Sequence, residues 1–129
     1  MAPKAAHSLD EVKRLINAYL QNGEDTVWFS AITRSVDQVT ALYPRFSTQE
    51  AVRFILEAVL SLSEQDFCSS NLQWGSTNLV ADVYGLIYDD KPWFVKFLIE
   101  NNTVEEISFH PPEKPLKTSG GKLIPGVKS

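Results

Sequence analysis

The chain has 129 residues, 43% of them hydrophobic and 22% charged, and its formal net charge is −4. That length fits one domain with its own core, and an acidic balance gives no long-range attraction to nucleic acid. Cys68 is the single cysteine, which excludes an internal disulfide and favours a reducing compartment. The charged N-terminus lacks a signal-peptide core, and no apolar run approaches the ~20 residues of a membrane span. We therefore expect a cytoplasmic protein without a membrane partner.

The first predicted element is a helix over about residues 9–21. Ser8 and Glu11 have the spacing of a capping box, in which each side chain bonds the other residue's backbone N–H. Apolar residues then recur at helical spacing, and Gly23 can end the helix in a left-handed conformation. The next stretch, residues 26–32, is apolar and suits either a short strand or the start of a helix.

Two more helices are predicted before the midpoint of the chain. One spans about residues 35–43, with a capping-box pattern beginning at Ser35 and a stop at Pro44. The next follows a further capping-box pattern at Ser47 and is apolar on most sides as far as Leu62. A helix with so narrow a polar edge must be largely buried, so we expect it to support the sheet.

The second half of the chain predicts strands. Residues 63–67 indicate a cap and one acidic turn, and residues 68–78 an irregular edge strand or a loop. Residues 79–110 hold three runs rich in aromatic and β-branched side chains, separated by Asp-Asp-Lys-Pro and by Asn-Asn, which indicates an antiparallel meander. The apolar sets should cover the core. Alternation then puts Lys96 and His110 on the opposite, open face of the sheet, if the register allows.

The predicted fold class is α+β, with N-terminal helices packed on a small antiparallel sheet in a single domain over residues 1–110. Residues 111–129 begin with Pro-Pro and hold four lysines against one glutamate, a net charge of +3. They are predicted to form an extended basic tail, whose simplest interpretation is a solvated terminus.

Several side chains of the strands are candidates for chemistry. His110 can give or take a proton near neutral pH, although a half-exposed histidine at a strand end is commoner than a catalytic one. Lys96 can bind a phosphate or snorkel to water along the sheet edge. Tyr84 can donate to a phosphate or a ribose, or be a core tyrosine with a satisfied hydroxyl. Trp74 and Trp93 can stack on bases, although tryptophan is more often a core or interface residue.

Signatures of a metal or nucleotide site are missing from the sequence. One cysteine and two distant histidines have no ligand spacing, no glycine-rich phosphate loop follows a predicted strand, and no GxSxG motif is present. We therefore expect neither a metal nor a cofactor.

Five short motifs occur in a characteristic order: SLDEVKRLINA near the N-terminus, LSLSEQDF after the third helix, then DVY, WFVKF and ISFH in the meander. In this order and spacing the chain resembles the MqsR family, the motility quorum-sensing regulator type of bacterial toxin. The resemblance runs from about Ser8 to His110. Residues 24–50 fit it loosely, and the tail after Pro111 lies outside it.

The resemblance implies a RelE-like fold and a metal-independent, ribosome-independent mRNA endonuclease, with mRNA and a cognate DNA-binding antitoxin as partners. Such an enzyme positions the ribose 2′-hydroxyl to attack the adjacent phosphate, using a base, an acid and cations. On this hypothesis His110 is the general acid or base, Lys96 the phosphate clamp and Tyr84 an orienting donor. Lys91 and Lys114 would join Lys96 in binding RNA.

Four positions depart from the family's pattern. Ser69 and His110 stand where the family has lysines, Ala81 where it has a glutamine, and Phe94 where it has a tyrosine, while the family's other lysine persists as Lys96. Each lost group is typically worth ~1–3 kcal/mol in a transition state, and His110 is the compensating change. The alternative is a catalytically degenerate fold that binds a protein or nucleic acid through its sheet face or basic tail.

Overall fold

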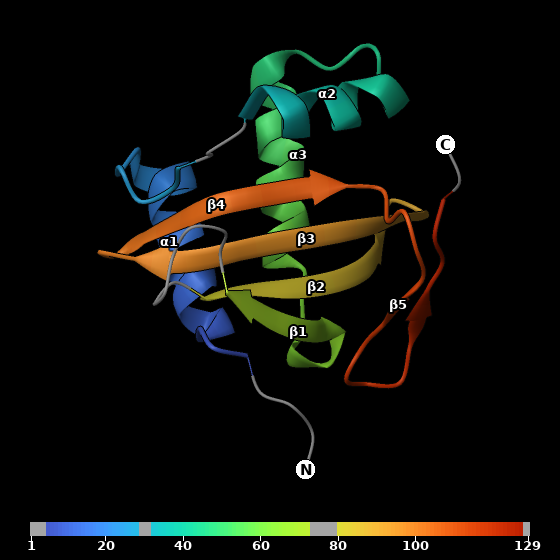
Figure 1. The fold of residues 1–129 in the computed structure, drawn as a ribbon. Helices are drawn as coiled ribbons and strands as arrows, with labels where there is room; N and C mark the ends of the chain where they lie inside the picture. The colour runs from blue at the N-terminus through green and yellow to red at the C-terminus, as the bar shows by residue number, and fades with distance from the viewer. Residues whose placement is uncertain (1–4, 29–31, 73–79, 128–129) are drawn as a thin grey trace.

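The computed structural model describes residues 5–28, 32–72 and 80–127, and it shows three helices followed by an antiparallel sheet (Figure 1). The α+β class predicted from the sequence is confirmed. The helices are α1 (Leu9–Asn22), α2 (Ile32–Leu42), α3 (Thr48–Leu60) and the short 3-10 helix η1 (Glu64–Asp66). The main sheet has the order β1-β2-β3-β4, with strands β1 (Phe67–Leu72), β2 (Val80–Tyr88), β3 (Lys91–Glu100) and β4 (Thr103–His110). A separate hairpin pairs β5 (Leu116–Lys117) with β6 (Leu123–Ile124).

Capping chemistry sets the start of two helices. The Ser8 hydroxyl accepts from the Glu11 N–H at 3.3 Å, although the Glu11 side chain pairs with an arginine instead of closing the box. Ser47 forms the complete predicted capping box at the start of α3. The prediction that Ser35 caps a helix is wrong: α2 begins at Ile32, so Ser35 lies inside it, where it is buried.

Residues 26–28 adopt the strand alternative of the two that the sequence allowed. Val27 forms a parallel bridge with Val104 of β4. The Trp28 N–H donates to the Val104 carbonyl at 2.8 Å, and the Val104 N–H donates to the Thr26 carbonyl at 2.9 Å. This short pairing gives part of the β4 edge a backbone partner. Residues 29–31 of the same stretch lie outside the described residues.

Both hairpins of the meander close with two residues of positive φ. The values are 53° and 61° at Asp89 and Asp90, and 53° and 59° at Asn101 and Asn102. Two such residues make the type I′ turn, whose twist matches that of the flanking strands, and Asp and Asn tolerate this left-handed conformation better than most residues. Asn101 and Asn102 thus form the second turn as a whole, while of the four residues predicted to separate the first two runs Asp89 and Asp90 form the turn and Lys91 and Pro92 already belong to β3.

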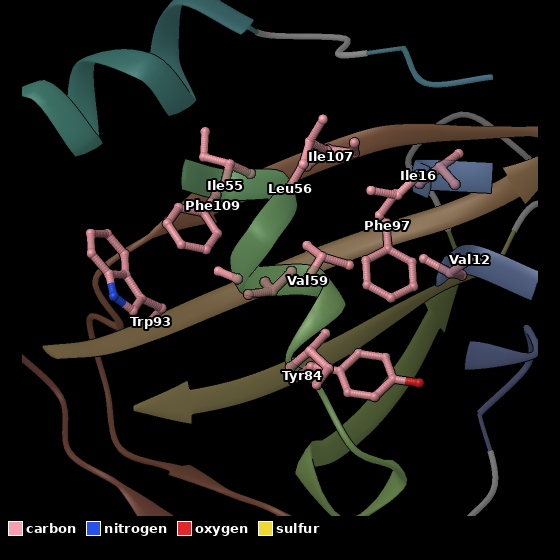
Figure 2. Packing of buried hydrophobic residues seen from close by; sticks show 14 of the residues in the cluster. Val12, Ile16, Ile55, Leu56, Val59, Tyr84, Trp93, Phe97, Ile107 and Phe109 are labelled. Atoms are coloured by element: carbon pink, nitrogen blue, oxygen red, sulfur yellow. The ribbon is translucent and has the colours of Figure 1, made fainter. Parts of the chain in front are cut away.

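The core lies between one face of the sheet and helices α1 and α3, as the apolar pattern of the third helix predicted. Figure 2 shows Leu56 and Val59 of α3 beside aromatic side chains of the strands. Trp93, Val95 and Phe97 alternate along β3 and are all fully buried on this side. Full burial of one such side chain is worth about 1.5–3 kcal/mol. We call this side of the sheet the helix-covered face.

The C-terminal residues do not form the predicted extended tail. The β5–β6 hairpin folds back onto the open face of β2, where it meets Gly85. A Cβ at Gly85 would lie 3.0 Å from the Leu116 side chain and 3.1 Å from that of Ile124. The hairpin tip is fixed as well, because the Ser119 N–H donates to the start of β1 at 2.7 Å and the Gly120 N–H to η1 at 2.9 Å.

Candidate functional site

Lys96 and His110 share the open face, as the alternation of the strands predicted. In the β3–β4 ladder Phe94 lies opposite His110, and Lys96 lies opposite Ser108. The residues that alternate with them are buried on the helix-covered face. The four side chains are partly exposed and form two adjacent cross-strand pairs, which we call the open-face group.

The His110 ring is held in one orientation. It stacks on the Phe94 ring, with 4.6 Å between the ring centroids and 15° between their planes. His110 Nδ1 lies 2.8 Å from the Pro111 carbonyl oxygen. A carbonyl can only accept, so Nδ1 carries the proton of this bond, and Nε2 of the neutral ring is left to take a proton from another molecule.

Lys96 supplies a positive charge beside this histidine. It is partly exposed, and within the described ranges it forms no ion pair with a carboxylate. The Ser108 hydroxyl lies on the cross-strand neighbour. An unpaired ammonium group next to a hydroxyl can bind a phosphate oxygen.

The open face also holds the other positions at which the resemblance places functional groups. Ser69 pairs with Val83 of β2, and Ala81 lies two residues before that partner on the same face. Asp82, between Ala81 and Val83 on β2, points to the helix-covered face, where it accepts from the Ser70 hydroxyl at 2.5 Å. Ala81 is fully buried and offers no polar group, so the polar side chains on this part of the open face are Ser69 and Asn71 of β1, whose Nδ2 donates to the Ser69 hydroxyl at 3.3 Å.

Tyr84 does not join Lys96 and His110, because it lies on the helix-covered face. Its ring stacks on Phe97 with 5.3 Å between centroids and meets Phe67 edge-on at 5.6 Å. The side chain is only 1% exposed. Figure 2 shows its hydroxyl directed away from the labelled core residues of α3. Burial, followed by the negative charges of nearby carboxylates, raises the pKa of Tyr84 far above its ordinary value.

The two other predicted RNA-binding lysines are also apart from the open-face group. Lys91 begins β3 on the same side as Trp93, and its Nζ donates to the Tyr43 hydroxyl at 3.1 Å. It also lies 4.7 Å from the centroid of the Tyr43 ring, and the hydrogen bond to Tyr43 raises the pKa of Lys91. Lys114 is exposed in the segment that leads from β4 to the hairpin.

Neither tryptophan proposed for base stacking is shown in such a role. Trp93 is fully buried, and its indole N–H donates to the Tyr88 carbonyl at 3.1 Å. Trp74 lies outside the described residues.

The described part of the chain contains no group of three or more His, Cys, Asp or Glu side chains placed to hold a metal ion. Within the same ranges, no helix has both the length and the apolar character needed to cross a membrane.

A pocket that the sequence did not reveal lies on the helix-covered face. It has a volume of about 420 Å³ and is lined by the N-terminal segment, η1 and the strands, including His7, Ser8, Glu64, Phe67 and Tyr84. No local pattern signals it, because its walls come from three segments far apart in the sequence.

Comparison of the chain with the models of known protein families finds no match. Comparison with functionally characterised proteins finds none either.

Proposed function

We propose that the chain is the toxin of a type II toxin–antitoxin pair, a metal-independent endoribonuclease that cleaves mRNA in the cytoplasm. The observation that carries this proposal is that His110 and Lys96 lie in adjacent cross-strand pairs on the open face, while the bond from His110 Nδ1 to the Pro111 carbonyl leaves Nε2 as the nitrogen that can accept a proton. A base beside a cation is the minimum that 2′-hydroxyl attack requires. The partners of this function are mRNA and a cognate antitoxin protein.

The cleavage step uses these groups in turn. His110 Nε2 takes the proton of the ribose 2′-hydroxyl, and the 2′-oxygen forms a bond to the adjacent phosphorus. Lys96 and the Ser108 hydroxyl stabilise the charge that develops on the phosphate oxygens. The bond from phosphorus to the 5′-oxygen breaks, and the protonated imidazole returns its proton to that oxygen. The products are a 2′,3′-cyclic phosphate and a 5′-hydroxyl.

The positions of the substituted residues also favour the open face as the catalytic surface. Ser69, Ala81, Phe94 and His110 differ from the pattern of the family that the chain resembles, and all lie on the open face with Lys96. Phe94 keeps the ring of the family's tyrosine without its hydroxyl, and that ring now stacks on His110. This arrangement fits a catalytic centre that has been rebuilt around a histidine.

A second candidate is a binding module without catalysis. It is favoured by the full burial of Ala81 and by the position of Tyr84, since both leave the open face with fewer polar groups than the resemblance implies. A module of this kind would keep its binding when His110 and Lys96 are replaced by alanine. Binding would be lost when the C-terminal hairpin is removed.

The proposal is tested by controlled expression in a bacterium. The wild-type chain should arrest growth, and His110→Ala should relieve the arrest at equal protein level. Lys91→Ala serves as the matched control, because Lys91 lies away from the open-face group, and it should arrest growth like the wild type. Absence of arrest by the wild type, or arrest that survives His110→Ala, would contradict the proposal.

A further inference from the structure

The Tyr84 hydroxyl has an unusual environment. The residue is 99% buried, and its hydroxyl has no hydrogen bond to another described residue. No fully buried side-chain nitrogen or oxygen of the described residues lacks a partner, so the hydroxyl oxygen is still open to solvent. A tyrosine whose ring is buried normally bonds its hydroxyl to protein or to water, because leaving the group unpaired costs about 1–3 kcal/mol. Tyr84 instead lines the pocket of about 420 Å³, so its hydroxyl is available to a molecule bound there.

Two aromatic rings and one carboxylate are among the described residues that line this pocket. The Tyr84 and Phe67 rings meet edge-on and form the apolar side, and Glu64 contributes an exposed carboxylate. Three carboxylates, those of Asp82, Glu64 and Asp66, are close enough to raise the pKa of Tyr84 through their charge. The hydroxyl is therefore neutral at physiological pH, in a region of negative potential.

Within the described residues, little positive charge opposes these carboxylates. Asp82 accepts from the backbone N–H groups of Ala6 and His7 at 2.9 and 2.8 Å and from a serine hydroxyl, all of them neutral donors. None of the described residues that line the pocket is a lysine or arginine, and His7 Nε2 lies 2.6 Å from the Val80 carbonyl. The positive end of the α1 dipole also faces this region, but it is offset by acidic residues in the first turn of the helix.

We propose that this pocket binds an organic cation, an alkylguanidinium or alkylammonium group. Its N–H donors would reach the Glu64 carboxylate and the Tyr84 hydroxyl oxygen, while its alkyl chain and charge would lie against the Phe67 and Tyr84 rings. Such a group comes either from a free small molecule or from an arginine or lysine side chain of a partner protein.

The pocket is independent of the proposed RNA site. Tyr84 lies on the helix-covered face, and His110 lies on the open face of the same sheet. A failure of RNA cleavage would therefore leave the proposed cation site untouched, and the reverse also holds.

The test is a titration of the isotope-labelled full chain followed by NMR. Agmatine represents the free cation, and an acetylated, amidated Gly-Arg-Gly peptide represents a protein side chain. Both probes should shift the amide resonances of His7, Glu64 and Phe67 saturably, without shifting those of Lys96 or His110. The tighter of the two probes identifies the source of the cation.

Variants decide whether the proposed groups bind the probe. Glu64→Gln should weaken binding by roughly tenfold, as expected for the loss of a charge-assisted hydrogen bond. Tyr84→Phe keeps the ring and should weaken binding severalfold, whereas Glu113→Gln, an exposed change on the C-terminal segment, should have no effect. The proposal is overturned if neither probe shifts the pocket at millimolar concentration, or if both pocket variants bind like the wild type. Thermal unfolding of each variant verifies that it is folded.

Discussion

At the scale of single residues, Asp82 fixes the N-terminal segment to the sheet. It is fully buried on β2, and its carboxylate accepts from the N–H groups of Ala6 and His7 and from the Ser70 hydroxyl. A buried carboxylate is tolerated only when it is hydrogen-bonded in this way. The pairing explains why the chain before α1 packs against β2, 75 residues away from His7 in sequence.

Replacing Asp82 by alanine should lower the free energy of unfolding by about 2–3 kcal/mol, because three donors lose their acceptor. Urea unfolding followed by circular dichroism measures this change. The exposed Asp25 offers a control, since Asp25→Ala should stay within about 0.5 kcal/mol of the wild type. An equal effect of both substitutions would show that the Asp82 hydrogen bonds do not stabilise the fold.

The effects of replacing Lys96 and Lys91 on RNA cleavage give a second prediction for single residues. Lys96→Ala should reduce RNA cleavage by about a hundredfold, the usual effect of removing one group that stabilises transition-state charge. Lys91→Ala should leave the rate nearly unchanged, because its ammonium group bonds Tyr43 at the hairpin end. Initial rates on a fluorescent RNA measure both. If the two variants lose activity equally, Lys96 has no special role.

At the scale of elements, the C-terminal hairpin differs most from the fold predicted from the sequence, which had an extended tail there. It packs on β2 only because residue 85 is a glycine, whose missing side chain leaves room for Leu116 and Ile124. Gly85→Val should therefore push the hairpin away and cost about 1–3 kcal/mol, as overpacking usually does. Hydrogen exchange should then become faster at the amide of Gly120, which donates to Gln65 in the wild type.

The same substitution type at an open position provides the control. Ser69 is exposed on β1, where its hydroxyl accepts from the Asn71 side chain at 3.3 Å, so Ser69→Val adds a similar side chain at the surface of β1 and should leave the exchange at Gly120 unchanged. Unchanged exchange in Gly85→Val would contradict the packing described for the hairpin.

Elements with local signals could be predicted, and those with distant partners could not. Ser8, Ser47 and the Asp and Asn pairs mark helix starts and turns within a few residues of each feature, so α1, α3 and the two hairpins follow from the sequence. The C-terminal hairpin depends on Gly85, some 30 residues earlier in the chain, and its glycines and prolines suggest an extended segment instead. The side of the sheet on which Tyr84 lies could not be predicted either, because β2 is buried on both sides and its apolar residues do not alternate.

At the scale of the whole molecule, the groups whose pKa is raised in the folded chain lower the free energy of unfolding at alkaline pH. Burial raises the pKa of Tyr84, Tyr43, Tyr88 and Cys68, and a hydrogen bond from its ammonium group to Tyr43 raises that of Lys91. In each case the folded chain holds the proton more tightly than the unfolded chain. The unfolded chain thus binds fewer protons as pH rises through the ordinary pKa values of these groups, and stability decreases with pH there.

The expected result is a free energy of unfolding that is nearly constant between pH 7 and 8 and declines above about pH 9, where free cysteine and then tyrosine and lysine begin to lose protons. Urea titrations at a series of pH values measure the decline. Tyr84→Phe removes the largest of these shifts, so its decline should be shallower than that of the wild type. A parallel decline in both proteins would show that Tyr84 does not contribute.

The central claim is that His110 on the open face cleaves RNA through the ribose 2′-hydroxyl. It is tested most directly by incubating the purified chain with a labelled RNA in the presence of a metal chelator. The wild type should cut the RNA and leave a 2′,3′-cyclic phosphate, while His110→Ala should be inactive and Tyr84→Phe should cut at the wild-type rate. The same RNA with a 2′-deoxy residue at the cleaved position should stay intact. Cleavage of the deoxy substrate, or full activity of His110→Ala, would contradict the account.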